Sequence, residues 1–267
     1  MRNLLIAATL LALVPSLTPG LAWGQEGADD ITVTILFDNY AATEGLRAAW
    51  GFAALLETPD HTVLFDTGNE GGPFMENLAA LGKDPAAIES VVISHAHWDH
   101  TGGLQALLET GITPRLFVLS AFAEEVRSLV PEGIEVIETQ AGQEIMPGVR
   151  STGLMGVEIP EQALFLETGA GAVVLTGCAH PGVVAMAEKA QELGAGPLHA
   201  VLGGFHLMEA TDEQLQGILA RFRELGVQKA GPTHCSGEHT VDVFREAYGA
   251  EFVELGSGRV LTFGSSG

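Results

Sequence analysis

Four side chains that commonly bind metal ions lie within one run of six residues, in the string SHAHWDHTGG. They are His95, His97, Asp99 and His100. Imidazole nitrogen and carboxylate oxygen suit zinc, manganese or iron at neutral pH. His95 and His97 point to the same side of an extended segment, because successive side chains alternate there. A turn at Trp98 then brings Asp99 and His100 to a second position, so the spacing predicts a site for two metal ions.

The motif follows a predicted strand and precedes a predicted helix. Residues 91–94 begin with an apolar, β-branched run that is typical of a buried strand. Thr101 is expected to cap a helix that carries Leu104 and Leu108 on one face, and the intervening Gly-Gly pair permits close backbone approach. The four candidate ligands therefore come just after the carboxyl end of a strand, where open α/β sheets commonly place ligand sites.

The second half of the chain repeats one pattern three times, with a strand, a tight turn that contains histidine, and a helix. The strands are predicted at residues 172–176, 199–202 and 229–233, and the turns carry His180, His206 and His234. Parallel strands end at one edge of a sheet, so we expect the three histidines on one rim. The second of the three helices begins with a capping box at residues 211–214.

The remaining apolar segments complete an alternating order of strands and helices. Strands are predicted at residues 31–37, 51–56, 62–66, 115–119, 134–138 and 163–168, and a helix at residues 74–81. No linker or low-complexity segment interrupts this order, which favours one domain over residues 31–267.

Residues 1–24 have the layout of a secretory signal peptide, with a basic residue, an apolar stretch over residues 4–14 and a small-residue cleavage site before Gln25. The apolar stretch is too short for a comfortable membrane span, and an uncleaved anchor is the alternative. We therefore expect an exported protein, periplasmic or secreted, in which residues 25–30 form a loose leader.

The charge of the chain limits its partners. It has 34 acidic and 12 basic residues, a formal net charge of −22. Such a chain repels phosphate backbones, which argues against nucleic-acid binding. A small anionic substrate stays compatible, because bound cations reverse the local field. We expect a small-molecule substrate, and no membrane contact once the signal peptide is removed.

Two cysteines, Cys178 and Cys235, lie beside His180 and His234 in the sequence. Three interpretations stay open: a disulfide between them, free thiols near the metal, and metal ligation by Cys178. We expect His180 and His234 to be ligands. His206 occupies an equivalent turn and either ligates metal, binds substrate or orients another ligand.

Several polar residues outside these turns are further candidates. Asp66 ends a predicted strand in the string FDTG, where it either forms a turn or orients a metal-bound histidine. Asp38 and Asn39 are expected at the same rim. Glu161 and Gln162 precede a strand and are either pocket residues or loop polar groups.

The motifs resemble the metallo-β-lactamase-fold superfamily of metal-dependent hydrolases, whose signature is HxHxDH. The resemblance extends over nearly all of residues 31–263 and is strongest to a branch with the strings ILFDN, LFDTGN, TGCAHPG, GGFHL and HCSG. Some members of that branch are named as 7,8-dihydropterin-6-methyl-4-(β-D-ribofuranosyl)aminobenzene-5′-phosphate synthases. The resemblance implies an αββα sandwich, in which two mixed β-sheets are flanked by helices.

Two positions depart from the superfamily pattern. Residues 160–164 lack the histidine of the usual PGHTxG turn, and Cys178 stands in place of the usual bridging aspartate. We expect His180 to replace one of these missing ligands and His206 the other.

The resemblance implies a hydrolase with two divalent metal ions, zinc first, with manganese or iron also compatible. One ion would be held by His95, His97 and His180, and the other by Asp99, His100 and His234. A metal-bound hydroxide would attack a small ester, lactone, amide or phosphoester, and Asp99 would orient it or move its proton. A synthase like the named branch members and a non-catalytic metal- or ligand-binding protein are the alternatives.

Overall fold

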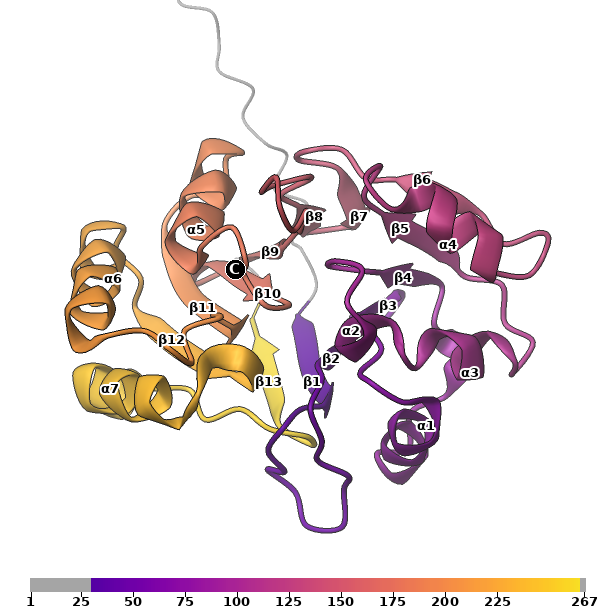
Figure 1. The fold of residues 1–267 in the computed structure, drawn as a ribbon, viewed down its shortest axis with the longest axis horizontal. Helices are drawn as coiled ribbons and strands as arrows, with labels where there is room; N and C mark the ends of the chain where they lie inside the picture. The colour runs from indigo at the N-terminus through magenta and orange to yellow at the C-terminus, as the bar shows by residue number, and fades with distance from the viewer. Residues whose placement is uncertain (1–29, 265–267) are drawn as a thin grey trace, which may run out of the picture.

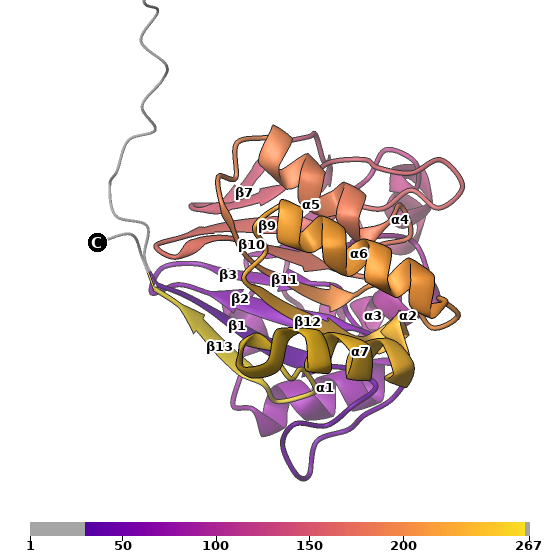
Figure 2. The same ribbon diagram turned by 90° about the vertical axis from the view of Figure 1, so that its left-hand side faces the viewer.

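Two β-sheets lie face to face, and helices cover the outer face of each sheet (Figure 1 and Figure 2). The computed structural model describes residues 30–264, so the predicted signal peptide at residues 1–24 lies outside the described residues. This architecture confirms the αββα sandwich. In the described part of the chain, no helix has the length and apolar character needed to cross a membrane.

The first sheet has seven strands, antiparallel at one end and parallel at the other. Their spatial order is β13 (Val260–Phe263), β1 (Ile31–Phe37), β2 (Ala53–Glu57), β3 (Thr62–Phe65), β4 (Ser90–Val92), β5 (Arg115–Val118) and β6 (Val136–Glu138). Its outer face packs against α1 (Gly71–Ala80), α3 (Leu104–Leu108) and α4 (Ala123–Leu129).

The second sheet has six strands, of which the first three in spatial order are parallel. The order is β12 (Lys229–Thr233), β11 (Leu198–Gly204), β10 (Gly171–Thr176), β9 (Leu164–Thr168), β8 (Val149–Ser151) and β7 (Glu144–Met146). Its outer face packs against α5 (Val183–Glu192), α6 (Asp212–Glu224) and α7 (Glu238–Tyr248). The predicted capping box, Thr211 with Gln214, begins α6.

Side chains of the central strands alternate between two cores. In β2, Ala54 and Leu56 face the core between the sheets, whereas Ala53 and Leu55 face the helices. Both faces of the central strands are therefore buried, and these strands are apolar at most positions. This pattern explains why most strands could be predicted from apolar runs.

Three short strands were not predicted. The hairpin of β7 and β8 has three residues in each strand, and β13 has four. Segments of this length carry too little periodicity to be distinguished from loops. β13 pairs with β1, so the end of the described chain completes a sheet that the beginning starts.

The predicted cap at Thr101 is wrong. Thr101 ends a separate short helix, α2 (Trp98–Thr101), and its hydroxyl donates to the carbonyl of His97. The chain then enters α3 through Gly103. A Cβ atom on Gly103 would lie 2.2 Å from the carbonyl oxygen of Thr67, so the predicted close backbone approach occurs and interrupts the helix.

Candidate metal centre

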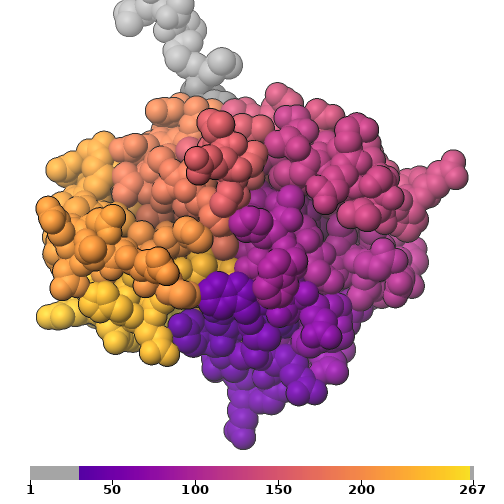
Figure 3. All heavy atoms as spheres, viewed as in Figure 1, coloured from indigo at the N-terminus to yellow at the C-terminus, as the bar shows by residue number. Residues whose placement is uncertain are grey.

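The candidate ligands come from both halves of the chain and meet between the two sheets. Figure 3 shows the first half, indigo to magenta, and the second half, orange to yellow, meeting along a seam on one face. His95 to His100 follow β4, and His180, His206 and His234 follow the parallel strands β10, β11 and β12. The predicted common rim is therefore present.

The first group of metal-type donors contains three imidazoles, from His95, His97 and His180. Their ligand atoms lie within 4.8 Å of one another. His95 Nε2 is 3.1 Å from His97 Nδ1, and the ring centroids of His95 and His180 are 4.7 Å apart. The structure thus brings together the three residues that were expected to hold one ion.

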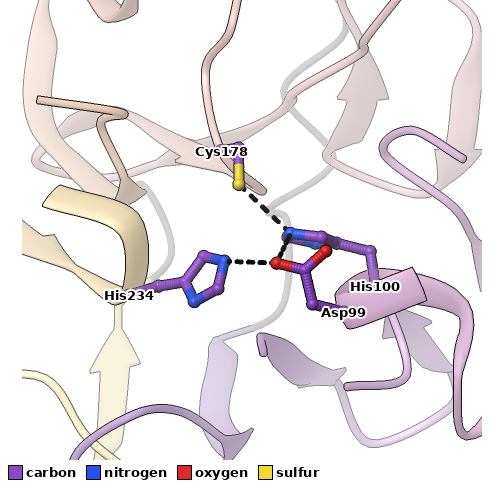
Figure 4. Close-up of side chains that lie close together, drawn as sticks. All are labelled: Asp99, His100, Cys178 and His234. Atoms are coloured by element: carbon purple, nitrogen blue, oxygen red, sulfur yellow. Dashed lines mark hydrogen bonds and ion pairs between the residues drawn. The ribbon is translucent and has the colours of Figure 1, made fainter. Parts of the chain in front are cut away.

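The second group contains Asp99, His100, Cys178 and His234, all buried and also within 4.8 Å of one another. Figure 4 shows these four side chains pointing toward one another. His234 Nε2 and His100 Nε2 lie 3.3 Å and 3.7 Å from Asp99 Oδ2. Cys178 Sγ lies 3.2 Å from His100 Nε2. The cysteine therefore faces the set of residues that was expected to hold the second ion.

His206 is placed differently from the other two turn histidines. His206 is exposed, and its ring nitrogen lies within 4.8 Å of the thiols of Cys178 and Cys235. Its ring centroid is also 4.3 Å from that of His180. Both cysteines are buried free thiols, so the disulfide interpretation does not describe this structure. The neighbouring Cys235 thiol and burial raise the pKa of Cys178.

Asp66 contacts His100 directly and His95 through Ser94. Its carboxylate is fully buried and accepts hydrogen bonds from the Ser94 backbone amide, the Ser94 hydroxyl and His100 Nδ1, each at 2.7 Å. The Ser94 hydroxyl also lies 2.8 Å from His95 Nδ1. Burial raises the pKa of Asp66 to about 7. The contact with His100 is the one expected of a residue that orients a ligand.

Glu161 holds the turn that carries His180. Its fully buried carboxylate accepts hydrogen bonds from the backbone amides of Cys178, Ala179 and His180 and from His180 Nδ1, at 2.7–2.8 Å. Burial opposes its charge, but the His180 hydrogen bonds and the charge interaction with His95 together outweigh burial and lower the pKa of Glu161 to about 2. From the sequence, Glu161 was either a pocket residue or a loop polar group, and its role as an anchor was not predicted. The segment without the usual histidine thus supplies the anchor for His180.

Three side chains near the start of the domain also contact the site or its turns. Asn39 Oδ1 lies 3.0 Å from His234 Nδ1, and its amide donates to the His234 carbonyl, which confirms that Asn39 reaches the rim. Asp38 accepts a hydrogen bond from Thr233, next to His234. Trp50 Nε1 donates to Asp99 Oδ2 at 2.9 Å. Trp50 was missed, because an exposed tryptophan carries no sequence signal for this contact.

These contacts leave one nitrogen of each anchored imidazole available. His95, His100, His180 and His234 each place Nδ1 against an oxygen acceptor, from Ser94, Asp66, Glu161 and Asn39 respectively. A ring that donates from Nδ1 keeps a lone pair on Nε2. Burial and the charges of neighbouring groups lower the pKa of His95 and of His100 to about 3, so both rings are neutral. Neutral imidazole is the form that binds metal.

The donor chemistry of the two groups fits divalent cations. Nitrogen, carboxylate and thiol donors together suit zinc, and oriented Nδ1 atoms are typical of histidine ligands. His234 Nε2 is buried, and its 3.3 Å contact with Asp99 Oδ2 lacks the geometry of a hydrogen bond. A buried polar atom without a partner is costly, and a cation between the groups would satisfy it.

Backbone strain gathers at the same rim. Among the described residues, four non-glycine residues have positive φ angles, namely Asp66, Ala179, His206 and His234. Such conformations cost about 1–3 kcal/mol each and cluster at functional sites. Each of these residues lies in the turn that follows a strand, and three of the four turns carry a candidate ligand.

Comparison with known proteins places this fold and site in a family. Residues 51–183 match the metallo-beta-lactamase superfamily. The crystal structure of Tm1679, a metal-dependent hydrolase of the beta-lactamase superfamily, is similar with a TM-score of 0.73 and 26% identity, over 86% of this chain and 98% of that chain. The chain therefore belongs to the metallo-beta-lactamase superfamily.

Two named relatives differ in how much of the chain they share. A 7,8-dihydropterin-6-methyl-4-(beta-D-ribofuranosyl)-aminobenzene-5'-phosphate synthase of Methanocaldococcus jannaschii is 27% identical over 88% of this chain and 97% of its own length. An N-acyl homoserine lactonase of Bacillus thuringiensis is 28% identical over 46% of this chain and 60% of its own length. The first similarity confirms the predicted branch.

Proposed function

We propose that this protein is an exported, metal-dependent hydrolase that acts on a small ester, lactone, amide or phosphoester. The observation that supports this most is the set of four imidazoles whose Nδ1 atoms are anchored and whose Nε2 atoms are available. His95, His97 and His180 would hold one divalent ion, and Asp99, His100, Cys178 and His234 the other. Zinc is the favoured ion for these donors.

Bound divalent cations would supply Lewis acidity, which lowers the pKa of water and polarises a carbonyl or phosphoryl oxygen. Asp99 would orient the attacking water or move its proton. Burial opposes the charge of Asp99, but His234 and His100 outweigh burial and hold its pKa well below the usual range. Trp50 Nε1 fixes the orientation of the carboxylate through Oδ2.

The serines near the site are engaged elsewhere, which favours water as the nucleophile. The Ser94 hydroxyl donates to Asp66. The Ser236 hydroxyl donates to the Thr233 carbonyl and accepts a hydrogen bond from the Phe205 amide. Both serines are fully buried, so neither hydroxyl is open to a substrate as a nucleophile must be.

Asp99→Ala tests the role of the carboxylate. We expect turnover by the zinc-loaded enzyme to fall by about 10²–10⁴-fold on a panel of esters, lactones, amides and phosphoesters. Circular dichroism and thermal unfolding check that the variant folds. Asp60→Ala, an exposed residue in a turn, is the matched control and keeps full activity. Retained turnover in Asp99→Ala would contradict the proposed mechanism.

Elemental analysis tests the number of ions. Protein purified without chelator is expected to contain two equivalents of divalent metal per chain. One equivalent would contradict the dinuclear proposal, and tight binding of a ligand with no turnover under any metal would favour the binding-protein alternative.

Export is a separate part of the proposal, and it depends on the sequence of residues 1–24. Mass spectrometry of protein from the periplasmic or culture fraction should find a mature chain that starts at Gln25. Recovery of only the full-length chain, from the cytoplasm, would contradict export.

A second candidate function is synthesis of the pterin compound named for the relative in M. jannaschii. The similarity over 97% of that relative's length favours it. Formation of that product from the ribofuranosylaminobenzene phosphate and a 7,8-dihydropterin that carries a leaving group on its 6-methyl carbon, at a rate above that of ester hydrolysis, would favour the synthase.

A further inference from the structure

A cavity of about 890 Å³ opens beside the candidate metal centre. Trp50 lines one side and also donates to Asp99, while Cys235 lines the cavity and lies in a group with Cys178 and His206. The cavity therefore adjoins the second group of metal-type donors through residues that belong to both.

A smaller cavity of about 190 Å³ continues toward the first group. It reaches His180 and shares Val184, His206, Leu207 and Ile218 with the larger cavity. The two cavities thus form one groove, which runs from His180 along the segment after β11 to residues 214–218 of α6.

The lining of this groove is mainly apolar. Trp50 and Met208 are 40% and 51% exposed, an arrangement that leaves two large apolar side chains in water unless a ligand covers them. Among the described residues that line the larger cavity there is no lysine or arginine, and Glu209 is acidic. Away from His206, which lies beside the metal-type donors, a phosphate or carboxylate group would meet no cationic side chain, whereas an uncharged apolar group would bury surface.

We propose that the groove binds an uncharged apolar part of the substrate, either an alkyl chain or a neutral ring, and that Gly217 sets how long this part can be. The proposal rests on the proposed hydrolase function and narrows it to neutral esters, lactones or amides with an apolar substituent.

Gly217 lies on the face of α6 that Gln214 and Ile218 also present to the cavity, since residues three and four apart share a helix face. A Cβ atom on Gly217 would have no neighbour within 4 Å. A larger side chain would therefore extend into the groove without displacing protein atoms. Gln216 is exposed on the opposite face of the same helix and does not line the cavity.

Binding of methyl ketones from 2-butanone to 2-dodecanone to the metal-loaded protein tests this proposal, because ketones are neutral and are not hydrolysed. Calorimetry is expected to show affinity rising about two- to fourfold per added methylene until the groove is filled. Gly217→Leu should reduce the ratio of long-chain to short-chain affinity by about tenfold. Gln216→Leu adds the same side chain outside the groove and should leave the ratio unchanged.

Met208→Ser gives an independent variant if Gly217→Leu does not fold, and it should also reduce long-chain affinity. Affinity that does not depend on chain length, or equal effects of the Gly217 and Gln216 variants, would overturn the proposal. Parallel turnover assays on p-nitrophenyl esters from acetate to decanoate, and on lactones and amides with the same range of chain lengths, separate the two proposals. Chain-dependent ketone binding without turnover of any of these substrates supports the groove and contradicts the hydrolase. Turnover with ketone binding that does not depend on chain length supports the hydrolase and contradicts the groove.

Discussion

Buried oxygen acceptors fix the orientation of His100, His180 and His234 by accepting hydrogen bonds from their Nδ1 atoms. Glu161 and Asp66 are carboxylates, and they accept hydrogen bonds from His180 and His100. A carboxylate behind an imidazole fixes its tautomer and raises its basicity as a ligand. Asn39 does the same for His234 with a neutral amide. The orientation of the candidate metal ligands is therefore set by residues that are not candidate ligands.

Glu161→Gln should weaken zinc binding by about 10–100-fold. Both carboxylate oxygens of Glu161 accept two hydrogen bonds each, so the amide of glutamine would place its own donors against the turn of His180. Competition with a chromophoric chelator measures the affinity. Glu167→Gln, on the partly exposed end of β9, is the control. Equal zinc affinity in both variants would show that Glu161 does not position the site.

At the scale of elements, the connection between α2 and α3 determines where the motif lies. The chain folds back on the loop after β3 because Gly102 and Gly103 have no side chains. Cβ atoms there would lie 2.0 Å and 2.2 Å from the carbonyl oxygens of Asn69 and Thr67. This close approach brings His100 over Asp66, which ends the adjoining strand.

Gly103→Ala should lower the free energy of unfolding by about 1–3 kcal/mol or more, because backbone atoms must shift to admit the methyl group. Gly72→Ala is the matched control, since a Cβ atom there meets nothing within 4 Å and the residue lies in α1. The control should leave stability unchanged or raise it by up to about 1 kcal/mol. Urea unfolding measures both, and equal stability of the two variants would contradict the packing argument.

At the scale of the whole molecule, the site joins the two halves of the sandwich. His95 to His100 belong to the first sheet's connections, whereas Cys178, His180 and His234 follow strands of the second sheet. Cations bound to both sets would link the sheets at one edge, in addition to the apolar core between them. Metal binding is then coupled to folding, because the unfolded chain has no assembled site.

Metal removal should therefore lower the melting temperature. Binding at 100 to 1,000 times the dissociation constant stabilises by roughly 3–4 kcal/mol, which corresponds to a fall of roughly 5–15 °C when a chelator removes the ions. Calorimetry with chelator, and with chelator already saturated with zinc as the control, measures the change. An identical melting temperature in both samples would mean that the ions do not link the halves.

The sequence alone determined the parts of this protein that depend on local pattern. Apolar runs predicted most strands, because both faces of the central strands are buried. The spacing of His95, His97, Asp99 and His100 predicted the two donor positions, because a strand end followed by a turn separates them. The motif strings also predicted the family that the comparisons confirm.

Only the tertiary structure decided which residues support those ligands. Asn39 meets His234 across 195 positions of the chain, and Trp50 meets Asp99 across 49. Glu161 reaches His180 only because the segment before β9 packs beneath the turn after β10. Such contacts depend on how the sheets pack, and single-sequence periodicity reports which face of an element is buried but not what lies against it.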